Sequence, residues 1–218
     1  FLRPRRFGKS TLLSMLEHYY DIGRKEEFDD LFKGLWVHEH PTPERNGYLV
    51  LSLDFSKLAS SGDGESLRES FCEAVKGSLR TFFMRYGARI PELAAMYDEL
   101  DRYRDAAALM SNVLGIIAGT TYKLYVLIDE YDNFANQLLS GGADVLYEEA
   151  IVERTGFVRG FYATLKAGTG TGAVARMFIT GVTPLMLDDL SSGFNIASNI
   201  SQDPDLNQLA GFSRADVE

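Results

Sequence analysis

Cysteine is nearly absent from this sequence. Cys72 is the only one in 218 residues, so the chain forms no internal disulfide and suits a reducing cytoplasm. It lies in an apolar helical pattern, which favours a buried small side chain over a reactive thiol. No apolar run reaches the roughly 20 residues that span a bilayer, and no signal peptide is visible. We therefore expect a cytoplasmic protein without a membrane span and, because the chain opens with Phe1 rather than Met, a piece of a longer protein.

Positive charge is also sparse. The chain has 22 Lys and Arg against 31 Asp and Glu, a formal net charge of −9. This excess of acid disfavours a broad nucleic-acid-binding surface on this segment. A local basic cluster runs against the trend, because Arg3, Arg5, Arg6 and Lys9 all fall among the first nine residues. Concentrated positive charge in an acidic chain predicts a small anionic ligand.

Short apolar runs alternate with amphipathic stretches along the chain. We expect strands over residues 48–55, 124–128 and 177–182, with Phe1 and Leu2 ending a further strand. A loop is expected over 168–172, and helices are expected over 9–20, 28–35, 66–86, 91–100, 104–117 and 148–165, with others beginning within 184–190 and near 206. The alternation predicts an α/β fold in which a mainly parallel sheet lies between helices.

The strongest motif is RPRRFGKST, residues 3–11, between an expected strand end and an expected helix start. It matches the phosphate-loop pattern G-x-x-x-x-G-K-[ST], except that Arg3 stands at the first glycine. Because backbone N–H groups hold the phosphates, this departure leaves the site intact. Lys9 is expected to reach the terminal phosphates and Ser10 to ligate magnesium. The competing interpretation is a basic helix start with a chance GKS. The expected binding residues are Arg6, Phe7, Gly8, Lys9, Ser10 and Thr11.

A second motif places two acids directly after an apolar strand, as Asp129 and Glu130 follow the run LYVLI. Acids at the carboxyl edge of a parallel sheet face a nucleotide bound there. We expect Asp129 to hold the magnesium shell and Glu130 to activate the attacking water as general base. A solvated acidic turn is the alternative. The order of the two motifs favours the joint interpretation.

Other polar residues are weaker candidates. Thr180 is the polar residue after the apolar part of the expected strand 177–182, and it would be a catalytic γ-phosphate sensor if that strand lay between the phosphate loop and the acids. A strand-end threonine with good β propensity explains it equally well. Asp54, at the end of strand 48–55, is a weaker candidate for the same edge. An arginine finger is typical of such sites, and the sequence does not choose among Arg154, Arg159, Arg176 and Arg214.

The segments FLRPRRFGKS, VLIDEYDNF and FITGVTPL, with FNIASNIS and the final GFSRADVE, resemble the bacterial AAA-ATPase-like family of the ASCE P-loop class. Arginine at the first glycine belongs to that pattern, whereas members usually carry a residue such as Ser between the residues matching Leu2 and Arg3. The resemblance implies a three-layer αβα P-loop NTPase core over 1–205, the start of a lid or linker over 206–218, and ATP and Mg²⁺ as ligands. It also implies a following domain, often a restriction-endonuclease-like nuclease.

Three functions are compatible with these residues. The leading hypothesis is an ATPase, with a homo-oligomer left open. The second is a nucleotide-gated interaction switch with little turnover, and the third is a scaffold whose degraded loop binds no nucleotide. No guanine-reading [NT]-K-x-D motif occurs, which favours ATP over GTP. A P-loop kinase is less favoured, because the pair Asp129-Glu130 suits activation of water.

Overall fold

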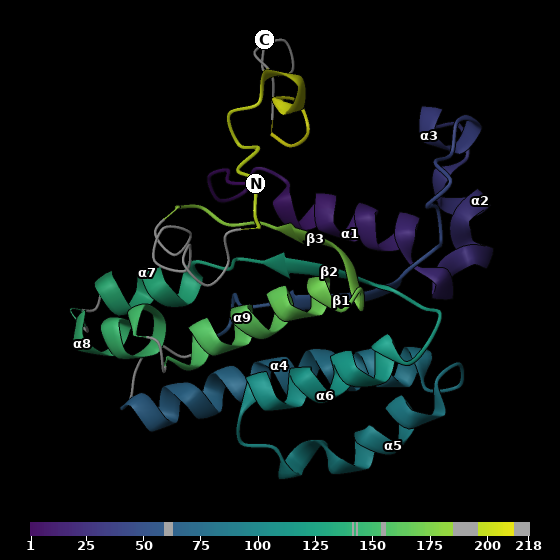
Figure 1. The fold of residues 1–218 in the computed structure, drawn as a ribbon. Coiled ribbons are helices and arrows are strands. Elements are labelled where there is room, and N and C mark those ends of the chain that lie inside the picture. The colour runs from purple at the N-terminus through teal and green to yellow at the C-terminus, as the bar shows by residue number, and fades with distance from the viewer. Residues whose placement is uncertain (59–62, 141, 143, 154–155, 185–195, 212–218) are drawn as a thin grey trace.

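A parallel sheet forms the centre of the molecule (Figure 1). The computed structural model describes residues 1–58, 63–140, 142, 144–153, 156–184 and 196–211. Three strands, β1 (Leu49–Asp54), β2 (Leu124–Asp129) and β3 (Val174–Ile179), pair in parallel in the order β1-β2-β3. This arrangement confirms the predicted α/β class with a parallel sheet.

The N-terminal residues extend the sheet beyond β3. Leu2 forms a parallel bridge with Gly181, and the Phe1 ammonium donates to the Ile179 carbonyl at 2.8 Å. The N–H of Arg3 donates to the Gly181 carbonyl at 3.2 Å. Strand β3 therefore lies between β2 and the segment that leads into RPRRFGKST.

Strand β2 is buried on both faces. Val126 and Ile128 belong to the main core, whereas Tyr125 and Leu127 belong to a smaller apolar cluster that includes Leu13. Successive side chains of a strand point to opposite faces. Because both faces of β2 are buried, the residues that point to either face are apolar, which explains the unbroken run LYVLI.

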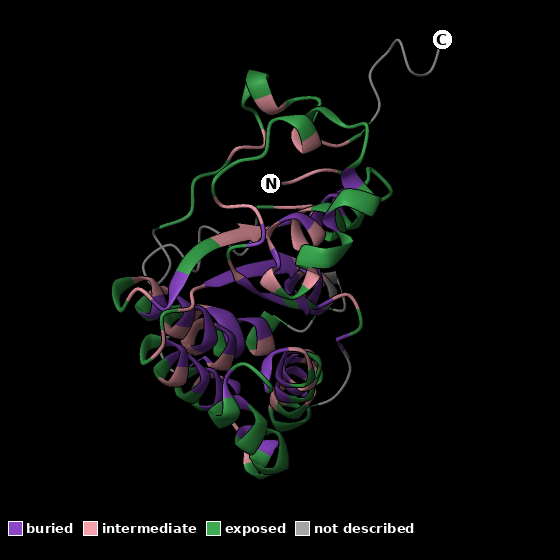
Figure 2. Cartoon of the chain, turned by 90° about the vertical axis from the view of Figure 1, so that its right-hand side faces the viewer, coloured by how far each residue is buried: buried purple, intermediate pink, exposed green. Residues whose placement is uncertain are grey.

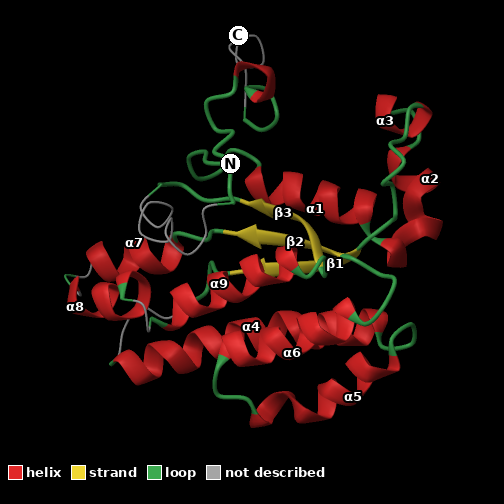
Figure 3. Cartoon of the chain, viewed as in Figure 1, coloured by secondary structure: helices red, strands yellow, loops and turns green. Residues whose placement is uncertain are grey.

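The two faces of the sheet carry different helices. Helix α1 lies on one side, and α4, α6 and α9 lie on the other (Figure 3). Figure 2 shows the buried residues concentrated in the sheet and on the inward sides of these helices. The longer helices are α1 (Lys9–Tyr20), α4 (Gly64–Tyr86), α5 (Pro91–Glu99), α6 (Ala106–Ala118), α7 (Asn133–Ser140) and α9 (Phe157–Gly170). The short ones are α2 (Phe28–Phe32), α3 (Trp36–Glu39), α8 (Asp144–Tyr147), a π-helical turn (Glu148–Val152) and 3-10 turns (Ile22–Glu27, Leu100–Arg102, Pro204–Leu206).

A buried polar cluster fixes the C-terminal end of α1. The Asp21 carboxylate is completely buried and accepts hydrogen bonds from the Gly23 N–H and the Tyr86 hydroxyl, each at 2.6 Å, and from Arg85 at 2.8 Å. The Tyr86 hydroxyl also accepts the N–H of Val50 at 2.9 Å. A buried carboxylate needs such partners. The cluster therefore anchors α1 to α4 and to the outer edge of β1.

Several expected elements have the observed bounds or nearly so. The helix over 9–20 is confirmed, as are the strands over 48–55 and 124–128 to within one residue. The expected helix over 28–35 ends early: α2 stops at Phe32, and Gly34 adopts the left-handed φ of 84° before the separate helix α3. Near 206 the chain forms only a 3-10 turn, and the helix expected within 184–190 lies largely outside the described residues.

Three expectations in the second half of the chain are wrong. The strand expected over 177–182 lies three residues earlier, as β3 (Val174–Ile179), so Thr180 directly follows the strand. The expected helix 148–165 is interrupted: a π-helical turn ends at Val152, Glu153 is extended, and α9 begins only at Phe157. Gly156 packs closely at this break, since a Cβ there would lie 2.4 Å from the Ala150 carbonyl oxygen. The expected loop 168–172 is helical through Gly170. Gly168 lets α9 approach its neighbours, since a Cβ there would lie 2.8 Å from Val174 and 2.9 Å from Leu114. Close packing outweighs the low helix propensity of glycine at this position.

Within the described residues, no helix is long and apolar enough to cross a bilayer.

Candidate functional site

The loop before α1 has the backbone of an anion-binding turn. Arg6 and Gly8 adopt left-handed conformations, with φ 68° and 80°. Left-handed residues within a short loop turn successive N–H groups toward a common concavity. For a non-glycine residue such as Arg6 this conformation costs about 1–2 kcal/mol. Strain of this kind gathers at functional sites.

Helix α1 begins with unpaired donors. It starts at Lys9, directly after Gly8, and no side chain of the described residues caps it. The first N–H groups of a helix have no intrahelical acceptor, and the helix dipole places partial positive charge there. By contrast, α4 and α6 have their first turns capped by Asp63 and Asp105. The start of α1 is therefore suited to an anion.

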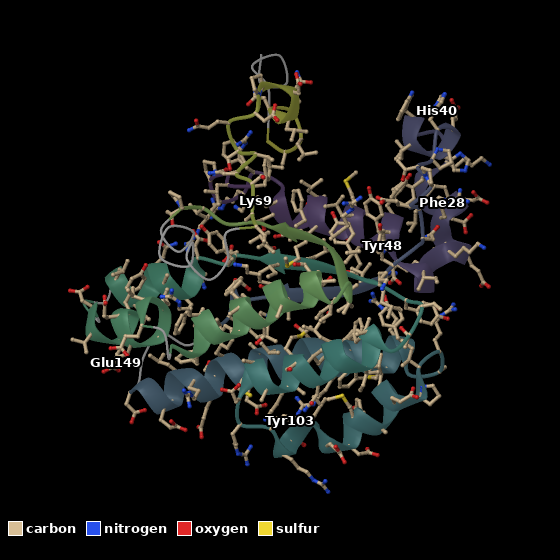
Figure 4. The ribbon with its side chains drawn as sticks, viewed as in Figure 1. Lys9, Phe28, His40, Tyr48, Tyr103 and Glu149 are labelled. Carbon is tan, nitrogen blue, oxygen red and sulfur yellow. The ribbon has the colours of Figure 1, made fainter. Side chains whose placement is uncertain are left out.

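The side chain of Lys9 is held inside the loop. It is 5% exposed, and its Nζ donates to the carbonyl oxygens of Arg3 at 2.9 Å and Pro4 at 3.1 Å. Figure 4 shows Lys9 at the start of α1, while Phe28 and His40 mark α2 and α3 near the opposite end of that helix. The ammonium group of Lys9 is therefore held by backbone carbonyls of the loop itself.

Three side chains from distant parts of the sequence meet at the strand tips. The Ser10 hydroxyl donates to Oδ2 of Asp129 at 2.5 Å, and the Thr180 hydroxyl donates to Oδ1 at 2.5 Å. Thr180 is completely buried, and its N–H donates to the Ile128 carbonyl at 2.8 Å. The structure thus brings together Ser10, Asp129 and Thr180.

Glu130 lies at the same edge with an unusual backbone. Its φ of 51° is left-handed, and its side chain is half-exposed. Its N–H donates to Oδ1 of Asp129 at 3.0 Å, and its carbonyl accepts the N–H of Asn133 at 3.0 Å. A non-glycine residue with positive φ is uncommon and marks strain. The backbone of Glu130 is therefore fixed directly beside the Asp129 carboxylate, at the end of β2.

The weaker candidates lie beside this cluster or away from it. Asp54 is the Cα partner of Asp129 in β1, on the side opposite Thr180, and its carboxylate accepts the N–H of Ser56 at 2.8 Å. Arg176 bonds Glu44 at 2.9 Å and lies four residues before Thr180, roughly 13 Å along the strand.

The remaining arginines give no finger within the described cluster. Arg159 donates to the carbonyl of Val152. Arg154 and Arg214 lie outside the described residues.

Sequence reasoning missed the second half of the acid motif. Asp132 is 1% exposed and accepts hydrogen bonds from the N–H groups of Val182 and Thr183, which follow β3. The neighbouring Tyr131 hydroxyl donates to the Thr183 carbonyl at 2.5 Å. The available signal was the string IDEYD itself, whose last acid had no assigned role.

A C-terminal segment packs on the outer side of the loop. The N–H of Leu2 donates to the Ser201 hydroxyl at 2.8 Å, and the Arg3 guanidinium donates to the Ser201 carbonyl at 2.6 Å. Gly211 lies against the ring of Phe7, where a Cβ would come within 2.9 Å of Cδ1. Residues 196–211 therefore contact both the N-terminal strand segment and the loop.

The fold and the site together are compatible with a P-loop-like protein, in which a loop before a helix lies beside strand-end acids. The family model described as "Predicted AAA-ATPase" matches residues 1–191. The chain belongs to this AAA-ATPase-like family. Comparisons with curated proteins and with solved structures give no match.

Proposed function

We propose that this chain is the ATP-binding and ATP-hydrolysing core of an AAA-like ATPase. It would be a three-layer αβα P-loop domain of the ASCE class over residues 1–205, with a lid or linker beginning over 206–218. The observation that carries the proposal is the shared carboxylate of Asp129, which accepts both the Ser10 hydroxyl and the Thr180 hydroxyl. Family membership supports the same activity.

The loop and the start of α1 bind the phosphates. The N–H groups of residues 6–11 donate to phosphate oxygens, as the left-handed turns at Arg6 and Gly8 favour. Lys9 exchanges its two carbonyl acceptors for oxygens of the terminal phosphates. This exchange needs no change in the position of α1, because a lysine side chain has several rotatable bonds.

The strand tips suit a magnesium ion. Ser10 and Asp129 present a hydroxyl and a carboxylate oxygen 2.5 Å apart, the hard oxygen donors that Mg²⁺ prefers. Within the described residues no group of three His, Cys, Asp or Glu side chains forms a metal site of its own. This fits an ion held by one or two protein groups plus phosphate oxygens. When bound, Mg²⁺ neutralises charge on the transferred phosphoryl group.

The remaining side chains act on water and on the terminal phosphate. Glu130 accepts a proton from the attacking water as the water oxygen bonds to the γ-phosphorus, while the bond from that phosphorus to the bridging oxygen breaks and ADP leaves. The buried Thr180 hydroxyl orients Asp129 and senses the γ-phosphate from the neighbouring strand end. In the intact protein we propose a cytoplasmic enzyme whose hydrolysis drives or regulates a C-terminal, nuclease-like effector domain.

Turnover of ATP in the presence of magnesium tests the proposal. Glu130→Gln keeps the size of the side chain but cannot accept the proton, so kcat should fall about 10²- to 10⁴-fold while ATP still binds. Glu92→Gln, at an exposed position in the first turn of α5, is the matched control and should keep wild-type turnover. Equal rates in wild type and Glu130→Gln contradict the assignment of the base.

A nucleotide-gated switch with little turnover is the second candidate. Both functions use Lys9 to bind the phosphates, and they differ in whether the bound ATP is hydrolysed. A single-turnover experiment with excess protein separates the two functions. Rapid conversion of bound ATP to ADP supports the ATPase, whereas binding that changes assembly state without conversion supports the switch.

A further inference from the structure

A second buried carboxylate connects the ends of β2 and β3 beside Asp129. Oδ2 of Asp132 accepts hydrogen bonds from the N–H of Val182 at 3.0 Å, from the N–H of Thr183 at 2.5 Å and from the Thr183 hydroxyl at 2.8 Å. It also accepts Nδ2 of Asn136 at 3.0 Å, and Oδ1 receives the N–H of Val182 at 3.1 Å. Because Asp132 is almost inaccessible to water, these donors supply the solvation that its carboxylate loses.

The backbone N–H groups that donate to Asp132 lie two and three positions after Thr180, the proposed γ-phosphate sensor. Thr180 is fixed on one side by its N–H bond to the Ile128 carbonyl, and its own carbonyl accepts the N–H of Tyr131 at 3.1 Å. Two residues later, Val182 begins the pair of N–H groups that Asp132 binds. The short stretch from Thr180 to Thr183 is thus pinned at both ends to the residues around Asp129.

Gly181 allows this close approach. A Cβ at Gly181 would lie 2.4 Å from Cε1 of Tyr131 and 2.5 Å from Oδ1 of Asp132. Gly181 also pairs with the segment leading to the phosphate loop, since its carbonyl accepts the N–H of Arg3 at 3.2 Å. Gly181 therefore contacts Tyr131 and Asp132 of the acid motif and the N-terminal segment that leads to the phosphate loop, and it directly follows Thr180.

We propose that Asp132 is a positioning residue for hydrolysis: it holds the turn after β3 so that the Thr180 hydroxyl reaches Asp129. This inference rests on the proposed ATPase function. Asp132 does not touch the reacting atoms, and its effect passes through residues 180–183. Displacements of about 1 Å at such supporting positions can cost about 100-fold in rate without abolishing binding.

The experiment compares two buried carboxylates in purified protein. Asp132→Asn keeps the shape, but in either orientation its NH₂ group faces backbone N–H donors. Asp21→Asn is the matched control, since Asp21 is equally buried and multiply bonded but lies at the C-terminal end of α1. Both variants should melt at lower temperature than wild type.

Kinetics should separate the variants. In Asp132→Asn, kcat should fall about 10- to 100-fold, while the dissociation constant of a fluorescent ATP analogue should stay within about 3-fold of wild type. In Asp21→Asn, both quantities should stay within about 2-fold, because Asp21 lies about 18 Å along α1 from Lys9 and distant sites usually act independently. A split between kcat and affinity is not expected of a residue that supports only folding.

Thr183 provides a milder perturbation of the same contact. Thr183→Val removes the hydroxyl that donates to Oδ2 of Asp132 at 2.8 Å and lies 3.2 Å from Oδ1 of Asn136, and it keeps the backbone N–H bond to Asp132. It should lower kcat about 3- to 10-fold. Thr183→Ser restores the hydroxyl and should restore kcat. If Asp132→Asn does not fold, Thr183→Val and Thr183→Ser test the positioning role instead. Unchanged kcat in Thr183→Val contradicts that role.

Failure of the proposed ATPase function and failure of the positioning role of Asp132 give different results. A folded wild-type protein without any ATP turnover contradicts the proposed function and the positioning role with it. Normal wild-type turnover together with unchanged kcat in folded Asp132→Asn contradicts the positioning role alone. Equal losses of kcat in Asp132→Asn and Asp21→Asn also contradict it, because a general loss of stability then explains both.

Discussion

Replacing Thr180 by valine removes one hydroxyl from the strand-tip cluster and little else. Thr180 is completely buried, and valine fills nearly the same volume, so no cavity forms. The variant loses the 2.5 Å bond to Oδ1 of Asp129. A hydrogen bond to a charged group contributes about 1.5–3 kcal/mol. If that amount is lost in the transition state, kcat falls about 10- to 150-fold.

The assay for this variant measures steady-state turnover at saturating ATP and magnesium, with binding of a fluorescent ATP analogue measured separately. Thr180→Ser keeps the hydroxyl and loses only a methyl group, so it should stay much closer to wild type than Thr180→Val. Wild-type kcat in Thr180→Val refutes the reasoning. Equal losses in the serine and valine variants do so as well, because packing rather than the hydroxyl then matters.

Two other predictions concern ionisable groups away from the strand tips. Burial raises the pKa of Glu17, but hydrogen bonds from Arg85 and Ser52 and the charges of Arg85 and Arg24 outweigh it, so the pKa lies below its usual value of 4.5. Ionised Glu17 therefore stabilises the fold above pH 4.5. Glu17→Gln should lower Tm at pH 7 by about 2–8 °C. In thermal melts at decreasing pH, the difference in Tm between wild type and Glu17→Gln should shrink below pH 4.5. Burial raises the pKa of the Cys72 thiol, which is 2% exposed. Iodoacetamide at pH 8 should modify Cys72 at least about 10-fold more slowly in folded protein than in urea, and equal rates would exclude the buried position.

The local sequence was sufficient to predict the elements that carry the site. An apolar strand running into Asp129 and a GKS turn opening a helix are short-range signals. The rule that parallel strands end at one edge then predicts that such groups approach one another. In the structure, the hydroxyl of Ser10 contacts Asp129. The roles of these residues in binding and hydrolysis stay predictions.

Features that depend on distant backbone were not predictable in this way. The donors that bind Asp132 are N–H groups of Val182 and Thr183, about 50 residues later, and any residue except proline supplies an N–H. At the break before α9, Gly156 lies so close to the Ala150 carbonyl that a Cβ would clash with it. Helix α7 is short and follows directly on the acid motif, so its pattern gave no separate signal. In each case tertiary contact decides what local propensity leaves open.

Calorimetric titration with ATP and magnesium tests most directly whether the loop before α1 is the nucleotide site. Lys9→Ala removes the ammonium that would contact the phosphates, and Lys25→Ala removes an exposed ammonium from the 3-10 turn after α1 as a control. Wild type and Lys25→Ala should bind ATP alike, and Lys9→Ala should bind it about 10- to 150-fold more weakly. Binding of equal strength in wild type and Lys9→Ala, or no binding by folded wild-type protein, would contradict the proposed site.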